Sequence, residues 1–172
     1  MKADIRIAPL APGHIESFRA CLDAVAREGR FLAMTEAPPL EAVRAFALAG
    51  LEQGAAQFVA LDGERVVGWA DILPSFGQAV AHCGRLGMGV LAASRGRGVG
   101  GRLLAACMER AGARGITRIE LEVRADNAAA IRLYEAAGFV REAVKRRAMR
   151  FDGVYYDALQ MSFLGGGAGP EG

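Results

Sequence analysis

The sequence lacks the features of several classes of protein. Its 172 residues contain no apolar run near the roughly 18 residues that a transmembrane helix needs, so no membrane association is expected. Asp4 and Arg6 interrupt the N-terminal segment before any long apolar stretch, so no secretory signal peptide is predicted.

Cysteine and net charge are also scarce. Cys21, Cys83 and Cys107 are odd in number and have no C-x-x-C spacing, which argues against a disulfide framework and against a zinc cluster. We therefore expect no metal site, and a reducing cytoplasm as the location. The 21 basic and 19 acidic side chains leave a formal net charge of +2, so nucleic acid is not expected as a partner.

The chain does contain ample material for a core. Hydrophobic residues make up 52% of the sequence and charged residues 23%, which are shares typical of a folded globular chain. This length suits one ordinary domain, because two separate cores would each be marginal. We predict a single domain over residues 1–164, followed by a flexible glycine-rich tail over residues 165–172.

Helical and strand patterns succeed each other along the chain. They predict helices over about 14–27, 40–53, 99 to the glycines at 112 and 115, and 127–137, and strands over 4–8, 57–61, 65–73, 79–90, 116–123, 139–151 and 154–163. Asp-Gly pairs at 62–63 and 152–153 predict hairpins. Asp126 is the expected N-cap of the last helix, and Gly138 is its left-handed end. This order predicts an α/β fold, a mixed sheet covered by helices on both faces.

Two predicted strands carry carboxylates among apolar residues. Alternation places Asp71 on one face with Trp69 and Val67, so this carboxylate lies either at a site or in an unusually buried place. In the strand over 116–123 the charged side chains point away from the apolar ones (Glu120, Glu122 and Arg124 against Ile119, Leu121 and Val123).

The densest cluster of glycine and arginine lies between a predicted strand and a predicted helix. It comprises Arg95, Gly96, Arg97, Gly98, Val99 and Gly100. The start of a helix has unpaired N–H groups and a partial positive charge, and glycine lets a ligand approach these donors closely. The cluster therefore predicts an anion cradle suited to phosphate or diphosphate.

Other types of loop fit this cluster less well. A Walker A loop needs a Lys-Ser/Thr pair that is missing here. A dinucleotide-binding fingerprint needs G-x-G-x-x-G near the first strand, whereas this chain has G-x-G-x-G in its middle. A glycine-rich turn that only opens a helix remains the alternative to an anion site.

Two motifs in register resemble the GNAT superfamily of acyl-CoA N-acyltransferases. The first, R-x-x-G-x-G, is matched by Arg95, Gly98 and Gly100, and the second, N-x-x-A-x-x-L-Y-E-x-x-G-F, is matched over residues 127–139. Ala92 departs from the family, in which proline is common at this position. The resemblance covers about residues 4–163 and implies a sheet of about seven mostly antiparallel strands, with splayed central parallel strands and helices on both faces.

The resemblance implies acetyl-CoA as co-substrate. Its pantetheine arm is expected between the strand that ends near Val90 and the strand over 116–123, against the backbone of Met88, Gly89 and Val90. The loop over 95–100 would hold the diphosphate, and Asn127 would contact the pantetheine or the start of the adjacent helix. The acceptor amine would attack the thioester directly in a ternary complex.

The resemblance also implies an acid and a base. Tyr134 is the expected acid, because the motif places its phenol at the thioester sulfur and a phenol stays protonated at pH 7. Packing of its ring on the sheet is the alternative. His82, Asp71 or Glu122, or a water leading to one of them, is the expected base, and His82 titrates nearest neutrality. The expected acceptor-binding residues are Glu36, Trp69 and Glu122.

Within the superfamily, the chain looks most like small bacterial N-acetyltransferases that act on amino acids or similar amines. We therefore expect acetyl transfer to the primary amine of a small molecule, which needs a closed pocket. Acetylation of a protein N-terminus or lysine, which needs a long open groove, is one alternative, and a noncatalytic acyl-CoA sensor is another. The family also leads us to expect a homodimer.

Overall fold

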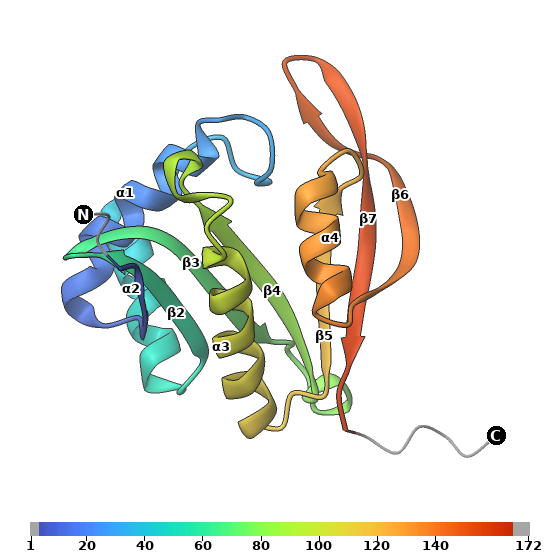
Figure 1. Cartoon of the computed structure of the whole chain (residues 1–172). Coiled ribbons are helices and arrows are strands. Elements are labelled where there is room, and N and C mark those ends of the chain that lie inside the picture. The colour runs from blue at the N-terminus through green and yellow to red at the C-terminus, as the bar shows by residue number, and fades with distance from the viewer. Residues whose placement is uncertain (1–3, 167–172) are drawn as a thin grey trace.

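The computed structural model describes residues 4–166 and contains one seven-stranded sheet (Figure 1). Its strands are β1 (Arg6–Pro9), β2 (Ala56–Asp62), β3 (Arg65–Pro74), β4 (Cys83–Val90), β5 (Arg118–Arg124), β6 (Val140–Phe151) and β7 (Val154–Leu164). Its α-helices are α1 (Ile15–Ala26), α2 (Leu40–Glu52), α3 (Val99–Ala113) and α4 (Ala128–Ala136). No helix within residues 4–166 is long and apolar enough to cross a membrane. Most of the expected tail over 165–172 lies outside the described residues.

The sheet has the spatial order β1-β2-β3-β4-β5-β7-β6, and only the pair β4–β5 is parallel. These two strands share only a short ladder, from Cys83 opposite Arg118 to Arg85 opposite Glu120. Beyond it, β4 continues to Val90 and β5 to Arg124 without pairing to each other. The predicted mixed sheet with splayed central parallel strands is therefore confirmed.

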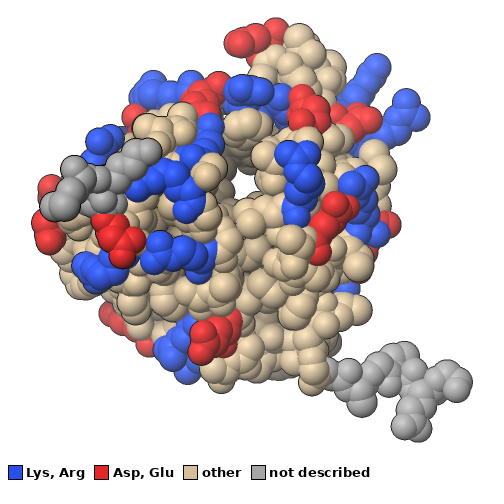
Figure 2. Space-filling view, in the orientation of Figure 1, with Lys and Arg blue, Asp and Glu red and all other residues tan. Residues whose placement is uncertain are grey.

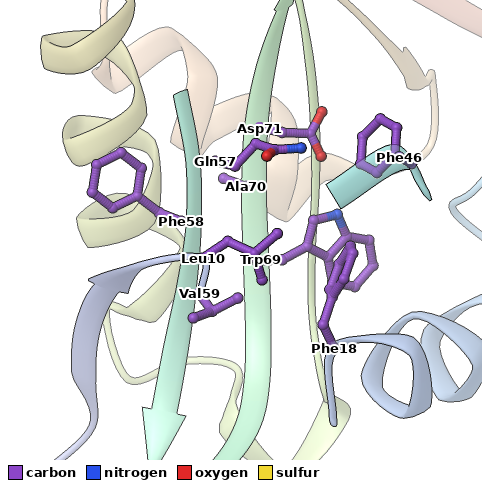
Figure 3. Close-up of a pocket in the computed structure, with 9 residues that line it drawn as sticks. All are labelled: Leu10, Phe18, Phe46, Gln57, Phe58, Val59, Trp69, Ala70 and Asp71. Atoms are coloured by element: carbon purple, nitrogen blue, oxygen red, sulfur yellow. The ribbon is translucent and has the colours of Figure 1, made fainter. Parts of the chain in front are cut away.

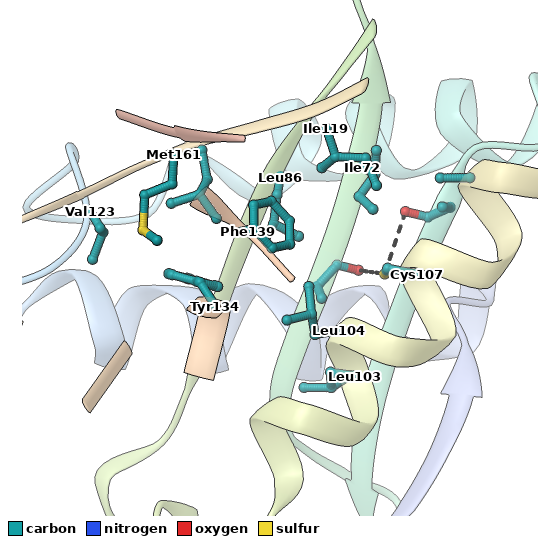
Figure 4. Close-up of a cluster of buried hydrophobic side chains, with 14 of the residues drawn as sticks. Ile72, Leu86, Leu103, Leu104, Cys107, Ile119, Val123, Tyr134, Phe139 and Met161 are labelled. Carbon is teal, nitrogen blue, oxygen red and sulfur yellow. Dashed lines mark hydrogen bonds between the residues drawn. The ribbon is translucent and has the colours of Figure 1, made fainter. Parts of the chain in front are cut away.

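Helices cover both faces of the sheet, as predicted (Figure 1). The apolar sides of α3 and α4 share one core with the sheet, and Figure 4 shows its centre. In that core the thiol of Cys107 donates a hydrogen bond to the carbonyl of Ala70 at 3.1 Å. The apolar sides of α1 and α2 form a second core on the opposite face, against Val59, Val66 and Trp69. Burial of both apolar faces is what drives this layering.

Two turns agree closely with the sequence. Asp152 and Gly153 both have positive φ, 47° and 81°, which is the backbone of a type I′ hairpin between β6 and β7. Gly138 has φ 93° and ends α4. Both predictions are therefore confirmed. They could be made from the sequence because positive φ values suit only a few residue types.

Two boundary predictions are wrong. The strand predicted over 79–90 begins only at Cys83, because Gln78–Val80 form a 3₁₀ turn after Gly77, which has φ 119°. The cap of α4 is Asn127, whose Oδ1 accepts a hydrogen bond from the Ala130 amide at 3.2 Å. Asp126, the predicted cap, instead accepts hydrogen bonds from Arg124.

The predicted face of β3 is also partly wrong. Ala60 pairs with Gly68 but Leu61 pairs with Val66, so β3 has one extra residue at this point. Such a bulge interrupts the alternation of side chains. Trp69 therefore shares the α1/α2 core with Val66, whereas Val67 lies in the α3/α4 core.

Candidate active site

The glycine loop forms an open nest of amides at the start of α3. Gly96 and Gly98 have φ values of 71° and 73°, and a Cβ at either would meet no neighbouring atom within 4 Å. Gly98 is the N-cap, and the first bond of the helix runs from the Arg102 amide to the Gly98 carbonyl at 3.2 Å. The amides of residues 99–101 therefore precede the helical ladder. They are free to donate to an anion, with the helix dipole behind them.

Gly100 has a packing role in the same loop. A Cβ at this position would lie 3.2 Å from Leu133 of α4 and 3.5 Å from Met88 of β4. The absence of a side chain lets α3 approach both elements closely. Val99 is buried beside it, and Arg97 is exposed on the loop.

Arg95 points toward the loop between α1 and α2. Its Nε donates to the Val90 carbonyl at 2.8 Å, and its two terminal nitrogens donate to the carboxylate of Glu28 at 2.9 and 2.7 Å. Its guanidinium also lies 5.5 Å from the ring centre of Phe31. The side chain predicted to bind diphosphate therefore ties the end of β4 to α1 and its following loop.

The splay between β4 and β5 exposes the backbone of the predicted pantetheine site. Met88 and Val90 pack toward the α3/α4 core, whereas Trp69 fills the space beside Gly89 on the other face. Figure 2 shows an opening through the molecule between the part that carries α3 and the part that carries α4, with Lys and Arg side chains around it. The structure thus brings residues 88–90 and the glycine loop to one gap in the sheet.

Tyr134 lies on α4, inside the α3/α4 core. It is only 8% exposed, and its ring packs against that of Phe139 with 5.8 Å between the ring centres (Figure 4). Burial raises the pKa of its hydroxyl to about 12, so the group stays protonated at neutral pH. Asn127, at the start of the same helix, uses its side-chain oxygen as the N-cap.

Asp71 lies on β3, on the side of the sheet that α2 covers (Figure 3). Its neighbour across the β3–β4 ladder is Gly87, just beyond the short parallel ladder where β4 leaves β5. Burial raises the pKa of the Asp71 carboxyl to about 7. Trp69, on the same face, is only 5% exposed and packs edge-on against Phe18, so it is a core residue rather than an open platform.

Glu122 lies on β5, across the splay from these residues. Its carboxylate accepts a hydrogen bond from Lys145 at 2.6 Å and forms an ion pair with Arg85 at 3.3 Å. As predicted, it points away from the α3/α4 core that Leu121 joins. The face that carries Asp71 on β3 thus carries Glu122 on β5.

The structure does not bring His82 or Glu36 to this gap. His82 is exposed before the start of β4, and the seven positions from 82 to 89 span about 23 Å of extended chain. Glu36 is 71% exposed on the loop after α1 and lies 3.5 Å from Arg27. Residues 4–166 contain no group of three or more His, Cys, Asp or Glu side chains that could hold a metal ion.

Arg124 is a central residue that the sequence did not single out. The strand pattern places it only on the side opposite Ile119, Leu121 and Val123. In the structure it is only 6% exposed and donates two hydrogen bonds to Asp126, of 2.6 and 2.8 Å. Its guanidinium lies 4.0 Å from the ring centre of Tyr156 and 5.9 Å from that of Phe31. Phe31 thus contacts Arg95 on one side of the splay and Arg124 on the other. Alternation alone could not reveal this bridge, because it depends on a distant loop.

Known proteins share the sequence pattern of this site. The sequence model of the Acetyltransferase (GNAT) family matches residues 21–139. The N-alpha-acetyltransferase RimI of Mycobacterium tuberculosis is 46% identical over 74 residues, which are 43% of this chain and 44% of that protein. The matched segment therefore spans less than half the length of that relative.

Solved structures share nearly the whole fold. A GNAT-family acetyltransferase from Streptococcus pneumoniae has a TM-score of 0.87 at 25% identity, covering 95% of this chain and 100% of that one. A GNAT phosphinothricin acetyltransferase from Sinorhizobium meliloti, solved in complex with acetyl-CoA, has a TM-score of 0.87 at 19% identity, covering 98% of this chain and 91% of that one. At 19% identity the second likeness shows the fold alone.

Proposed function

Because the chain belongs to the acetyltransferase (GNAT) family, we propose that it moves the acetyl group of acetyl-CoA to a primary amine by direct attack in a ternary complex. Membership makes the protein an acyltransferase, which disfavours the alternative of a noncatalytic sensor. The observation that carries the proposal is the nest of amides at residues 99–101, placed at the gap between β4 and β5.

The residues at this gap suit the co-substrate. The nest offers donors to a diphosphate, and no Cβ blocks the approach at Gly96 or Gly98. Beyond the short parallel ladder, residues 88–90 of β4 pair with β3 on one edge only. Their other edge, which faces β5, has no partner strand, so an extended arm can pair with it as an added strand. Acetyl-CoA supplies an activated thioester with a good leaving group.

Tyr134 is the proposed acid. Its hydroxyl keeps its proton at neutral pH, since burial raises its pKa to about 12. It donates that proton to the departing sulfur, which needs one as the carbon–sulfur bond breaks. The proposal needs no covalent intermediate on a cysteine, because the amine attacks the thioester directly; Cys21 and Cys107 are in any case buried in the two cores.

Asp71 is the proposed base. As the new nitrogen–carbon bond forms, the amine loses a proton, and a carboxylate with a pKa of about 7 can accept it at neutral pH. Asp71 lies opposite Gly87, close to the gap, whereas His82 lies about 23 Å of strand away from Gly89. Glu122, on the β5 side, is already paired with Lys145 and Arg85, so the proposal gives it no role toward the acceptor.

The α-amine of a polypeptide N-terminus is the acceptor that we favour. The support is the 46% identity to an N-alpha-acetyltransferase over 74 residues, together with the open passage in Figure 2. A small amine is the second candidate, because the aromatic-lined cavity beside Asp71, with Phe18, Phe46 and Trp69, has room for only about one water, which suits a small group better than a polypeptide (Figure 3).

A thiol-release assay with acetyl-CoA separates these acceptors. The panel holds free amino acids, peptides with a free N-terminus, and the same peptides with a blocked N-terminus and an internal lysine. We expect the highest kcat/KM for free N-termini, with mass spectrometry locating the acetyl group on the α-nitrogen. Equal or faster release with free amino acids would favour the small-amine acceptor. No CoA binding and no release with any amine would contradict the proposed function.

A further inference from the structure

Gln57 on β2 is buried without any hydrogen bond. Gln57 is only 4% exposed. Within residues 4–166, its Nε2 and Oε1 are the only buried side-chain nitrogen and oxygen atoms that lack a hydrogen-bond partner. Burying an unpaired amide is unfavourable, and an apolar residue would avoid that cost. A glutamine at this buried position therefore suggests a role other than packing.

The neighbour of Gln57 is the proposed base. The β2–β3 register places Gln57 directly opposite Asp71, and directly opposite residues share a face of the sheet. Figure 3 shows the amide of Gln57 beside the carboxylate of Asp71, with Phe46 and Trp69 around them. The unpaired amide therefore lies beside the carboxylate of Asp71, on the β3 side of the gap.

Two glycines leave room for this pair. A Cβ at Gly50 of α2 would collide with the amide group of Gln57. A Cβ at Gly87 of β4 would lie 3.3 Å from Asp71 Oδ1. Helix α2 and strand β4 thus both have glycine at the positions that face these two side chains.

Among residues 4–166, burial alone raises the Asp71 pKa, so no charged side chain competes with Gln57 for its carboxyl group. Across the sheet, α3 presents Cys107, whose pKa is raised by burial and by Asp71 itself. On β4, Arg85 is engaged by Glu122. The faces of β2 and α2 toward Asp71 present Gln57, Phe46 and Gly50, none of which titrates. The amide of Gln57 is thus the polar group best placed to act on the carboxylate.

We propose that Gln57 is a positioning residue for Asp71: its Nε2, which has no partner in this structure, turns to donate a hydrogen bond when the Asp71 carboxyl ionises, and holds the carboxylate toward Gly87, where β4 leaves β5. The proposal rests on the proposed function for the role of Asp71 as base. A donor favours the charged form of a carboxyl group, so Gln57 eases the ionisation that burial opposes. Its Oε1 is left to a water or to the acceptor amine.

Replacement of Gln57 by Met tests this role. Met has similar length and no hydrogen-bonding amide, and it removes the buried unpaired atoms, so the variant is expected to fold. We expect the Asp71 pKa, followed by carbon NMR of the carboxyl group in the free protein, to rise by about one unit. The acidic limb of the pH–kcat/KM profile should move by the same amount. Gln57→Leu repeats the test with a second apolar side chain, and Gln53→Met, an exposed glutamine at the end of α2, is the control.

Each outcome decides one part of the proposal. An unchanged Asp71 titration in Gln57→Met and Gln57→Leu would show that the amide does not act on the carboxylate, and would overturn it. A raised Asp71 pKa with an unmoved acidic limb would overturn the link to catalysis. The NMR titration needs no acetyl transfer, so it stands even if the protein acetylates none of the amines tried.

Discussion

The two faces of the sheet build their parts of the site in different ways. On the α3/α4 face, two continuous segments supply the chemistry: the loop over 95–100 and the helix start and body over 127–134. On the α1/α2 face, Gln57, Asp71 and Glu122 come from three different strands. The first face holds the co-substrate in our proposal, and the second receives the acceptor. A site made from contiguous residues can be found from spacing, whereas one made across strands depends on register.

The largest effect is expected on the co-substrate face. Tyr134→Phe removes one hydroxyl and keeps the ring against Phe139. We expect kcat to fall about 100-fold, because general acid catalysis contributes on the order of 10² to 10⁴ in rate. The dissociation constant of CoA, measured by calorimetry, should stay within about twofold. Tyr155→Phe, on the exposed surface of β7, is the control. A normal kcat in Tyr134→Phe would show that Tyr134 is not the acid.

The next effect is on the amide nest itself. Gly98 has φ 73°, a region that a β-branched side chain enters only with strain. Gly98→Val should therefore shift the first amides of α3 and weaken CoA binding about 100-fold, the upper end of a strain of about 1–3 kcal/mol. Gly112→Val is the matched control, because Gly112 lies near the other end of α3, its φ is not positive and its surroundings are open. Equal CoA affinity in both variants would contradict the nest as the diphosphate site.

The sequence predicts tight turns well because their signals are local. Gly138, Asp152 and Gly153 were placed correctly since their positive φ values belong to short stretches of chain. His82 is the opposite case. Its residue type suits a base, but only the three-dimensional structure shows that it lies at the far end of β4 from the gap.

Register and distant loops explain what the sequence could not show. One extra residue in β3 separates Val67 from Trp69 and Asp71, and nothing in the alternation marks the bulge. Arg124 is buried because β7 and the loop after α1 cover it, at distances of 4.0 Å from Tyr156 and 5.9 Å from Phe31. Such long-range contacts leave no periodic trace in a single sequence.

The raised pKa of Asp71, on the acceptor face, should make the stability of the protein depend on pH. The pKa of Asp71 is about 7 in the folded protein against an ordinary value of 3.8, so between these values the unfolded chain binds fewer protons than the folded one. Stability must then fall as pH rises through this window. Asp71→Asn removes that loss, so its free energy of unfolding should gain about 4 kcal/mol on the wild type between pH 4 and pH 8. Urea denaturation measures it, with Asp152→Asn in the exposed hairpin as control. A gain that does not change with pH would contradict the raised pKa.

The smallest predicted effect concerns Arg95, which joins the two faces. It begins the co-substrate loop, yet its guanidinium binds Glu28 and the Val90 carbonyl and stacks near Phe31. A lysine keeps the charge but loses the fork that reaches both partners. If the side chain bound diphosphate, this substitution would act mainly on CoA affinity. If it holds the loop after α1, it would act mainly on the acceptor.

We expect Arg95→Lys to raise the acceptor KM about fivefold, the size of a partly exposed ion pair near 1 kcal/mol, and to leave CoA affinity within about twofold. Glu28→Gln should act in the same direction, and the double variant should add little, since both changes break one contact. Arg141→Lys is the control, because Arg141 forms an exposed ion pair with Glu135, away from the loop after α1. Hydrogen exchange of residues 28–37 in the free protein should speed up in both single variants. Weaker CoA binding with unchanged hydrogen exchange in that loop would show that Arg95 binds the co-substrate and does not hold the loop after α1.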